Sequence, residues 1–223
     1  MLRRNLKACV RLWKEARKPC HRVRCHNIKP DRQEYIRGQE MVVKGIADRA
    51  TNRLLEAKLI SFSGVDKRID VFVTALSFKA KAEDLFHLDL AYASPFSTTK
   101  DPVMYTGMIL ENALCRDKPL ITAADLIALE TSGEPYTLVD ARASAQYADR
   151  HVPGAVNIPQ ERFRAAADTL TLGAPGITYC NKGTTGNAAQ NILLGKGFRR
   201  VYNLSGGKMQ YRMTPRALQT KQR

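Results

Sequence analysis

Long hydrophobic runs are missing from this sequence. Although 44% of its 223 residues are hydrophobic, no apolar stretch approaches the ~20 residues that a membrane-spanning helix requires. A secretory signal is not evident, and the five cysteines follow no regular spacing of the kind found in disulfide-stapled domains. These absences argue against a membrane span and a disulfide framework, and we expect a protein of the reducing cytoplasm.

Acidic residues are scarce relative to basic ones, with 21 Asp and Glu against 36 Lys and Arg and a net charge of +15. Residues 1–40 alone contain twelve basic and four acidic residues. Such a charge is compatible with nucleic-acid binding, but no aromatic interleaving and no nucleic-acid motif accompanies it. We therefore expect no nucleic-acid partner. An attraction for anionic small molecules, such as phosphorylated cofactors, is equally open.

Serine is missing from residues 1–30, which argues against an organelle transit peptide despite the arginines there. We expect residues 1–28 to form a basic, poorly ordered surface segment, or a short amphipathic helix over residues 6–16. The pairs Cys20-His21 and Cys25-His26 lie too close together for the two knuckles of a zinc finger, so we expect no metal site. At the other end of the sequence, we expect residues 214–223 to form a basic tail.

What the sequence does contain is a cysteine in a pattern typical of a reactive site. Residues 177–179 are β-branched or aromatic and lead up to Cys180, a loop with two glycines follows, and residues 188–193 show helical spacing. The pattern predicts strand, tight loop and helix. Backbone N–H groups that converge at a helix N-terminus stabilise an anion, here a thiolate or a persulfide on Cys180. The alternative is a buried structural cysteine.

The first half of the chain has the pattern of an α+β domain. Residues 41–47 and 54–62 predict two strands joined by a polar hairpin connection. Helical spacing follows over residues 65–78 and 81–90, and Pro102 opens a further helix that continues to residue 114.

The second half changes to alternating strands and helices, which indicates a parallel α/β sheet. Thr122 and Asp125 form a capping box that opens the first helix, and Gly133 ends it. Further strands are predicted over residues 136–140, 155–158, 177–179 and 200–204, and helices over residues 143–149, 161–170 and 185–194.

The stretches Gly64-Val-Asp-Lys-Arg-Ile-Asp-Val71 and Leu88-Asp-Leu-Ala-Tyr-Ala-Ser-Pro-Phe-Ser-Thr-Thr-Lys-Asp-Pro-Val103 resemble the dimerisation domain of pyridine-nucleotide disulfide reductases. The similarity is to the coenzyme A-disulfide reductase and NADH oxidase branch and covers residues 29–114. It implies a homodimer in which Tyr92 faces the partner's active site, with an interface or core tyrosine as the alternative. The first strand of that domain is expected to be absent, so the domain is truncated at its N-terminus.

No G-x-G-x-x-G fingerprint occurs anywhere in the chain, so the FAD- and NAD(P)H-binding domains of a full reductase are not represented. We expect no cofactor in this chain. FAD, NAD(P)H and coenzyme A enter only by analogy with the full-length family. The resemblance implies the C-terminal part of a longer enzyme or a degenerate relative, and a separate FAD- and NAD(P)H-binding polypeptide is one partner that it allows.

Residues 121–213 resemble a rhodanese domain in four motifs that occur in the right order: Leu138-Val-Asp-Ala-Arg142, Arg150-His-Val-Pro-Gly-Ala-Val-Asn-Ile-Pro159, the Cys180 loop, and Gly197-Phe-Arg-Arg-Val-Tyr-Asn-Leu-Ser-Gly-Gly207. Some members of the reductase branch named above carry a C-terminal rhodanese domain, so the two resemblances support each other. Together they imply an α/β fold: an α+β dimerisation domain followed by a rhodanese-like domain with a parallel sheet.

The rhodanese resemblance implies that Cys180 takes the outer sulfur of a sulfane-sulfur donor as a persulfide and passes it to a thiol acceptor or cyanide. The backbone N–H groups expected to stabilise the charged sulfur belong to Asn181, Lys182, Gly183, Thr184, Thr185 and Gly186. The glycines let the loop close tightly, and Lys182 adds a positive charge that favours an anionic donor. Asp140 and Arg142 lie where members of the family pair charges near the loop, and we favour a structural salt bridge. We expect His151 to stabilise its turn.

One position departs from the family pattern. Many rhodanese loops carry an arginine five residues after the cysteine, where this chain has Thr185. A phosphatase of the same fold needs an arginine at the end of the loop to hold the phosphoryl group bidentately. Thr185 and Gly186 therefore argue against phosphatase and arsenate-reductase activity.

Three hypotheses follow. The first is a sulfurtransferase or persulfide carrier joined to a reductase dimerisation domain. The alternative is a non-catalytic dimerisation and docking fragment, which the missing nucleotide-binding half and the missing loop arginine favour. A third, nucleic-acid or membrane-surface binding through the basic N-terminal segment, predicts strongly salt-dependent association.

Overall fold

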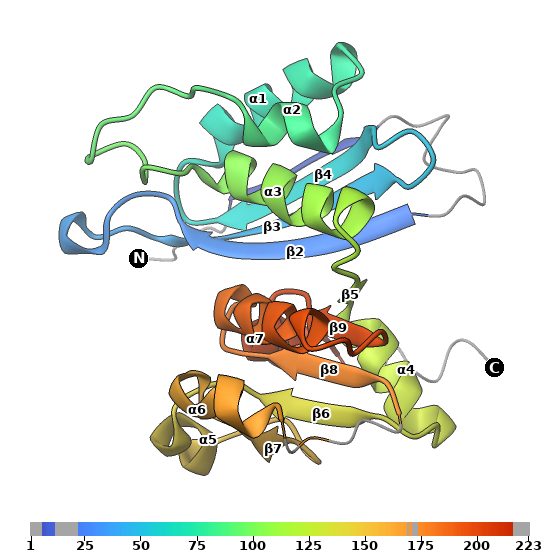
Figure 1. Cartoon of the computed structure of the whole chain (residues 1–223). Coiled ribbons are helices and arrows are strands. Elements are labelled where there is room, and N and C mark those ends of the chain that lie inside the picture. Colours follow the sequence, from blue (N-terminus) through green and yellow to red (C-terminus); the bar gives the residue numbers. More distant parts are fainter. Residues whose placement is uncertain (1–5, 12–21, 169, 171–173, 216–223) are drawn as a thin grey trace. The chain divides into compact units, whose positions relative to one another are not determined.

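The computed structural model describes residues 6–11, 22–168, 170 and 174–215. The chain divides into two compact units, Met1–Asp117 and Lys118–Arg223, each built on its own sheet (Figure 1). Within the described ranges, no helix is both long enough and apolar enough to cross a membrane.

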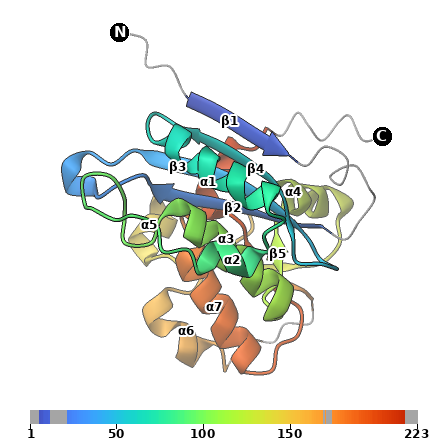
Figure 2. The same cartoon turned by 90° about the horizontal axis from the view of Figure 1, so that it is seen from above.

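The first unit is an antiparallel four-stranded sheet covered by helices. Its strands are β1 (Leu6–Arg11), β2 (Arg22–Pro30), β3 (Glu40–Asp48) and β4 (Leu54–Ser61), in the order β1-β4-β3-β2. Helices α1 (Val65–Ser77), α2 (Ala82–Phe86) and α3 (Pro102–Cys115) lie on one face of this sheet (Figure 1, Figure 2). Helix α1 contacts β4 and β1, whereas α3 contacts β2 and β3.

The hairpin β3–β4 and the three helices confirm the secondary structure predicted for residues 41–114, although α2 ends at Phe86. Two expectations for the first 28 residues were wrong. Residues 6–11 form a strand where a helix was one expectation, and the sheet takes in residues 22–28 rather than leaving them as a surface segment. In β2, Val23, Cys25 and Asn27 are buried at every second position, the period of a strand, with basic residues between them. The Cys20-His21 pair lies outside the described residues.

The second unit is a parallel five-stranded sheet with helices on both faces. The strand order is β5-β9-β8-β6-β7, formed by β5 (Leu120–Ile121), β6 (Thr137–Asp140), β7 (Val156–Asn157), β8 (Gly176–Tyr179) and β9 (Val201–Leu204). One apolar core lies beneath α4 (Ala123–Ser132) and α8 (Gly207–Met213). A second core, on the other face, lies beneath α6 (Gln160–Ala166) and α7 (Thr184–Gly195). The short helix α5 (Ser144–Asp149) follows β6.

The predicted alternation of strands and helices is therefore confirmed, and so is the capping box: Thr122 Oγ1 accepts from the N–H of Asp125, whose carboxylate accepts from the N–H of Thr122. Two elements were not predicted. Strand β5 has only two residues, too few for a periodic pattern, and α8 begins at a pair of glycines that reads as a turn. Part of the basic tail, residues 216–223, lies outside the described residues.

A buried ion pair joins three segments of the first unit. The Arg68 side chain, 1% exposed on α1, donates through Nε to both carboxylate oxygens of Asp101 at 3.2 and 3.0 Å. Its Nη2 donates to the carbonyl oxygen of Asp31 at 2.6 Å. Asp101 in turn caps α3 by accepting from the N–H of Val103 at 3.0 Å. Arg68 therefore links α1, the end of β2 and the start of α3.

We predict that Arg68→Met destabilises the first unit by about 3–5 kcal/mol, because it leaves the buried Asp101 carboxylate without its cation. Urea unfolding followed by circular dichroism measures this. The matched control is Lys67→Met on the exposed side of the same helix, for which a change within about 0.5 kcal/mol is expected. Equal unfolding curves for the two variants would contradict the prediction.

Candidate functional site

Cys180 lies at the carboxyl end of β8, in the short loop that leads into α7. It is a free cysteine and 5% exposed. The backbone N–H of Gly183 donates to Cys180 Sγ at 3.2 Å. Gly183 has φ +101°, a conformation that favours glycine, and it caps the N-terminus of α7. The chain thus turns back so that a backbone donor points at the sulfur, an arrangement that stabilises a negative charge there.

The turn between β9 and α8 holds the same loop from another side. The N–H of Lys208 donates to the carbonyl oxygen of Cys180 at 2.8 Å, and the N–H of Met209 donates to that of Asn181 at 3.0 Å. Gly207 permits this approach, since a Cβ atom on it would lie 2.3 Å from the Cys180 oxygen. The first turn of α8 therefore satisfies the loop carbonyls and fixes the backbone on either side of the sulfur.

The start of α7 is packed against the sheet just as tightly. A Cβ atom on Gly186 would lie 2.6 Å from Asn203 Oδ1 and 2.9 Å from the Cα of Tyr179. Asn203 Nδ2 donates to the carbonyl oxygen of Gly183 at 3.1 Å, and Thr178 Oγ1 donates to that of Gly186 at 2.9 Å. The helix start is thus tied to β8 and β9, and the loop has little freedom to shift.

Asp140 and Arg142 form the predicted salt bridge, and both are buried. Arg142 Nε donates to Asp140 Oδ1 at 2.9 Å, and Arg142 Nη2 donates to Oδ2 at 2.6 Å. Burial by itself lowers the pKa of Arg142, but the hydrogen bonds and the charge of Asp140 outweigh it and raise that pKa. The guanidinium also reaches the loop, where Nη1 donates to Asn181 Oδ1 at 3.3 Å. The pair is therefore structural and also orients a loop side chain.

Beside the loop lies an open depression of about 410 Å³. Its lining residues are Arg142, Ala145, Gln146, Asp149, Asn181 and Lys208. The sequence offered no reason to single out Lys208, which is 8% exposed and donates from Nζ to the carbonyl oxygen of Arg150 at 2.5 Å. Gly207 was included in a quoted motif, but no role was predicted for it or for Asn203.

The predicted loop residues divide between two elements. Asn181, Lys182 and Gly183 form the loop proper, whereas Thr184, Thr185 and Gly186 belong to the first turn of α7. The N–H of Gly183, one of the six groups predicted to serve the sulfur, donates a hydrogen bond to Sγ. The roles of the others stay predictions.

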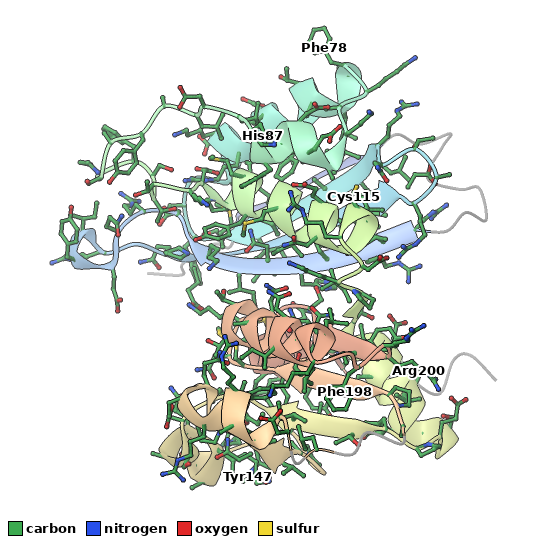
Figure 3. The ribbon with its side chains drawn as sticks, in the orientation of Figure 1. Phe78, His87, Cys115, Tyr147, Phe198 and Arg200 are labelled. Carbon is green, nitrogen blue, oxygen red and sulfur yellow. The ribbon has the colours of Figure 1, made fainter. Side chains whose placement is uncertain are left out.

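Two further predicted residues lie away from the loop. His151 steadies its turn, since its Nδ1 lies 3.0 Å from the carbonyl oxygen of Tyr147 and its ring stacks on the Tyr147 ring at 3.9 Å. Figure 3 shows Tyr147 on α5.

Tyr92 belongs to the first unit and is half exposed. Hydrogen bonds with Ser94, Thr99 and Gln33 lower the pKa of Tyr92. Over the described ranges, no group of three His, Cys, Asp or Glu residues is placed to hold a metal ion.

The comparisons with known proteins agree with this geometry. The family described as "Rhodanese-like domain" matches residues 122–214. The thiosulfate sulfurtransferase GlpE of Pseudomonas entomophila is 31% identical over 87 residues, which make up 39% of this chain and 80% of that protein. The NAD(P)H coenzyme A polysulfide/persulfide reductase of Pyrococcus horikoshii is 36% identical over 77 residues, but the match spans only 17% of its length.

Among solved structures, reduced Bacillus anthracis CoADR-RHD is similar over 93% of this chain, with a TM-score of 0.84 and 25% identity. The match spans 37% of that larger chain. The fold is also that of an NAD-dependent persulfide reductase from A. fulgidus, with a TM-score of 0.76 at 24% identity. The matched residues include the Cys180 loop and the elements that hold it, and through residues 122–214 the chain belongs to the rhodanese family.

Proposed function

We propose that this chain is a rhodanese-type sulfurtransferase that carries sulfur as a persulfide on Cys180. One observation carries the proposal: within a rhodanese-like domain, a free cysteine at the end of β8 receives a backbone N–H on its sulfur, 3.2 Å from Gly183 N. A donor aimed at a buried sulfur stabilises the anionic forms that sulfur transfer needs.

With thiosulfate as donor, the Cys180 thiolate attacks the outer sulfur, an S–S bond forms on the protein, and the S–S bond of thiosulfate breaks to release sulfite. The product is a Cys180 persulfide with one negative charge. In the second step an acceptor, cyanide or a thiolate, attacks the outer sulfur and the Cys180 thiolate leaves. Both steps transfer one sulfur atom without an external oxidant or reductant. The Gly183 N–H donates to Sγ, which carries the negative charge before the first step and after the second.

We further propose that the first unit is the dimerisation domain of a coenzyme A-disulfide-reductase-like protein and that the chain forms a homodimer. Support comes from the similarity to CoADR-RHD, which extends over both units. These 223 residues carry no dinucleotide-binding fingerprint, so any FAD or NAD(P)H is held outside them, and we propose a separate FAD- and NAD(P)H-binding polypeptide as a partner.

We predict that Cys180→Ala abolishes sulfur transfer from thiosulfate to cyanide, because the loop contains no other thiol to carry the sulfur. The thiocyanate assay measures this, and mass spectrometry of the thiosulfate-treated protein should find one added sulfur atom on the Cys180 peptide. The control is Cys115→Ala. Cys115 is exposed at the end of α3, in the first unit (Figure 3). Undiminished turnover by the Cys180 variant would exclude the proposed chemistry.

The contact between Gly207 and the loop gives a second prediction, with Gly154→Ala as its matched control. Both glycines have positive φ, +56° and +76°, but a Cβ atom on Gly154 would meet nothing within 4 Å. Both variants bear the backbone strain of about 1 kcal/mol, whereas only Gly207→Ala must also push the Cys180 carbonyl away. We expect Gly207→Ala to unfold about 1–3 kcal/mol more easily than Gly154→Ala, from the added overpacking.

Activity measurements on Gly207→Ala and Gly154→Ala distinguish a loss of folding stability from a displacement of the Cys180 loop. Gly207→Ala should lose at least tenfold in sulfur transfer at a temperature where circular dichroism shows it folded, since the Cys180 backbone has moved. Gly154→Ala should retain its activity. Loss of stability without loss of activity in Gly207→Ala would show that the loop geometry does not depend on the α8 turn.

The dimer is tested by light scattering with size-exclusion chromatography, for which the homodimer predicts twice the mass of the 24.9 kDa chain. Deleting residues 1–117 should give a monomer if the first unit holds the dimer together. A stable dimer with no sulfur transfer would favour the alternative of a docking module. A monomeric full chain would exclude the proposed role of the first unit.

A further inference from the structure

Lys208 is a lysine with little access to water at the edge of the cysteine loop. Its ammonium donates to the carbonyl oxygen of Arg150 at 2.5 Å, and Arg142 Nη2 donates to the same oxygen at 2.8 Å. Two cations therefore share one carbonyl. Burial first, and then the charge of Arg142, lower the pKa of Lys208. Burial of the Lys208 ammonium is unfavourable, and one hydrogen bond to a carbonyl oxygen offsets that cost only in part.

The two cations differ in how their charges are balanced. Arg142 has the fully buried Asp140 carboxylate in a bidentate ion pair. In the part of the chain that the structure describes, no carboxylate forms an ion pair with Lys208. Asp149 acts on it at longer range, and so does the cationic Arg212. Lys208 is thus a cation with space for an anionic partner.

That space is the depression beside the loop. Asn181, directly after the nucleophile, and Lys208 both line it, together with Arg142, Gln146 and the exposed Asp149. Its volume of about 410 Å³ suits a small molecule. Amide side chains of Asn181 and Gln146 add polar groups, and Asn181 is the residue that follows Cys180 in the chain.

We propose that Lys208 is a specificity-determining residue: its ammonium receives the anionic group, a sulfonate or a carboxylate, of the small molecule that reacts at Cys180. The substrate class rests on the proposed sulfur transfer. The charge preference itself does not, because it governs any small reagent that approaches Cys180 through the depression.

The experiment uses two alkylating reagents of nearly the same size, iodoacetate and iodoacetamide, which differ in charge. Each forms an S–C bond with the Cys180 thiolate and releases iodide. Alkylation rates are read on the Cys180 peptide by mass spectrometry, so the other cysteines do not enter. Burial raises the pKa of Cys25 to about 12, which keeps that thiol unreactive in the folded protein.

We expect Lys208→Met to lower the ratio of the iodoacetate rate to the iodoacetamide rate by about three- to tenfold, the effect of removing one nearby charge in a partly buried site. Lys208→Arg keeps the charge and should stay close to the wild-type ratio. Lys196→Met removes the same charge at the far end of α7 and should leave the ratio unchanged. An unchanged ratio in Lys208→Met, or an equal fall in Lys208→Arg, would overturn the proposal.

Turnover then identifies which molecule carries the anion. If it is the donor, Lys208→Met raises KM for thiosulfate by a similar factor and changes kcat less. If it is the acceptor, the variant loses rate with 3-mercaptopropionate but not with the neutral 2-mercaptoethanol. Failure of both would overturn the substrate assignment. An inactive wild-type protein whose alkylation ratio still depends on Lys208 would refute the proposed sulfur transfer and keep the charge preference.

Discussion

The candidate site depends on one backbone contact, in which the start of α8 donates to the carbonyls of the cysteine loop. A carbonyl that lies next to a stabilised thiolate or persulfide is itself a source of negative partial charge, and unless it is turned away and paired it opposes the anion. The N–H groups of Lys208 and Met209 pair the carbonyls of Cys180 and Asn181. This leaves the N–H of Gly183 free to point the other way, at the sulfur. The loop thus directs the carbonyl oxygens of Cys180 and Asn181 toward α8 and the N–H of Gly183 toward the sulfur.

The charges around the loop follow from this arrangement. The Asp140–Arg142 pair is a buried ion pair and not a surface salt bridge. The Arg142 guanidinium donates hydrogen bonds to Asp140, to Asn181 and to the Arg150 carbonyl oxygen. The Asp140 carboxylate neutralises the positive charge of Arg142. Lys208 brings a second cation to the same carbonyl because its backbone is already held against the cysteine. A single residue therefore contributes to the loop through its main chain and to the depression through its side chain.

The part of the site that is formed by consecutive residues could be predicted from the sequence. The apolar run before Cys180, the glycine that turns the loop and the helical spacing after it are consecutive, and they predicted β8, the loop and α7 correctly. The contacts of Gly207, Lys208 and Asn203 with the loop join residues at least twenty positions apart, and no periodicity encodes them. The strands of residues 6–11 and 22–30 were misjudged for another reason. Their basic residues dominate the composition and hide the alternation of Val23, Cys25 and Asn27, which matters only once β3 pairs beside them.

The packing of α7 explains why one of the two positions at the end of the loop is a glycine. Gly186 has no room for a side chain, because a Cβ atom there would meet Asn203 Oδ1 at 2.6 Å and the backbone of Tyr179 at 2.9 Å. Thr185, one residue earlier, is in the first turn of α7, with no guanidinium to clamp a phosphoryl group from that side. The cations near Cys180 come instead from Lys182 within the loop, from Arg142 after β6 and from Lys208 on α8. A flexible ammonium attracts an anion as a point charge without fixing the geometry of a planar or tetrahedral group. Such an arrangement suits the approach of a small anion to a nucleophilic sulfur better than it suits the in-line transfer of a phosphoryl group.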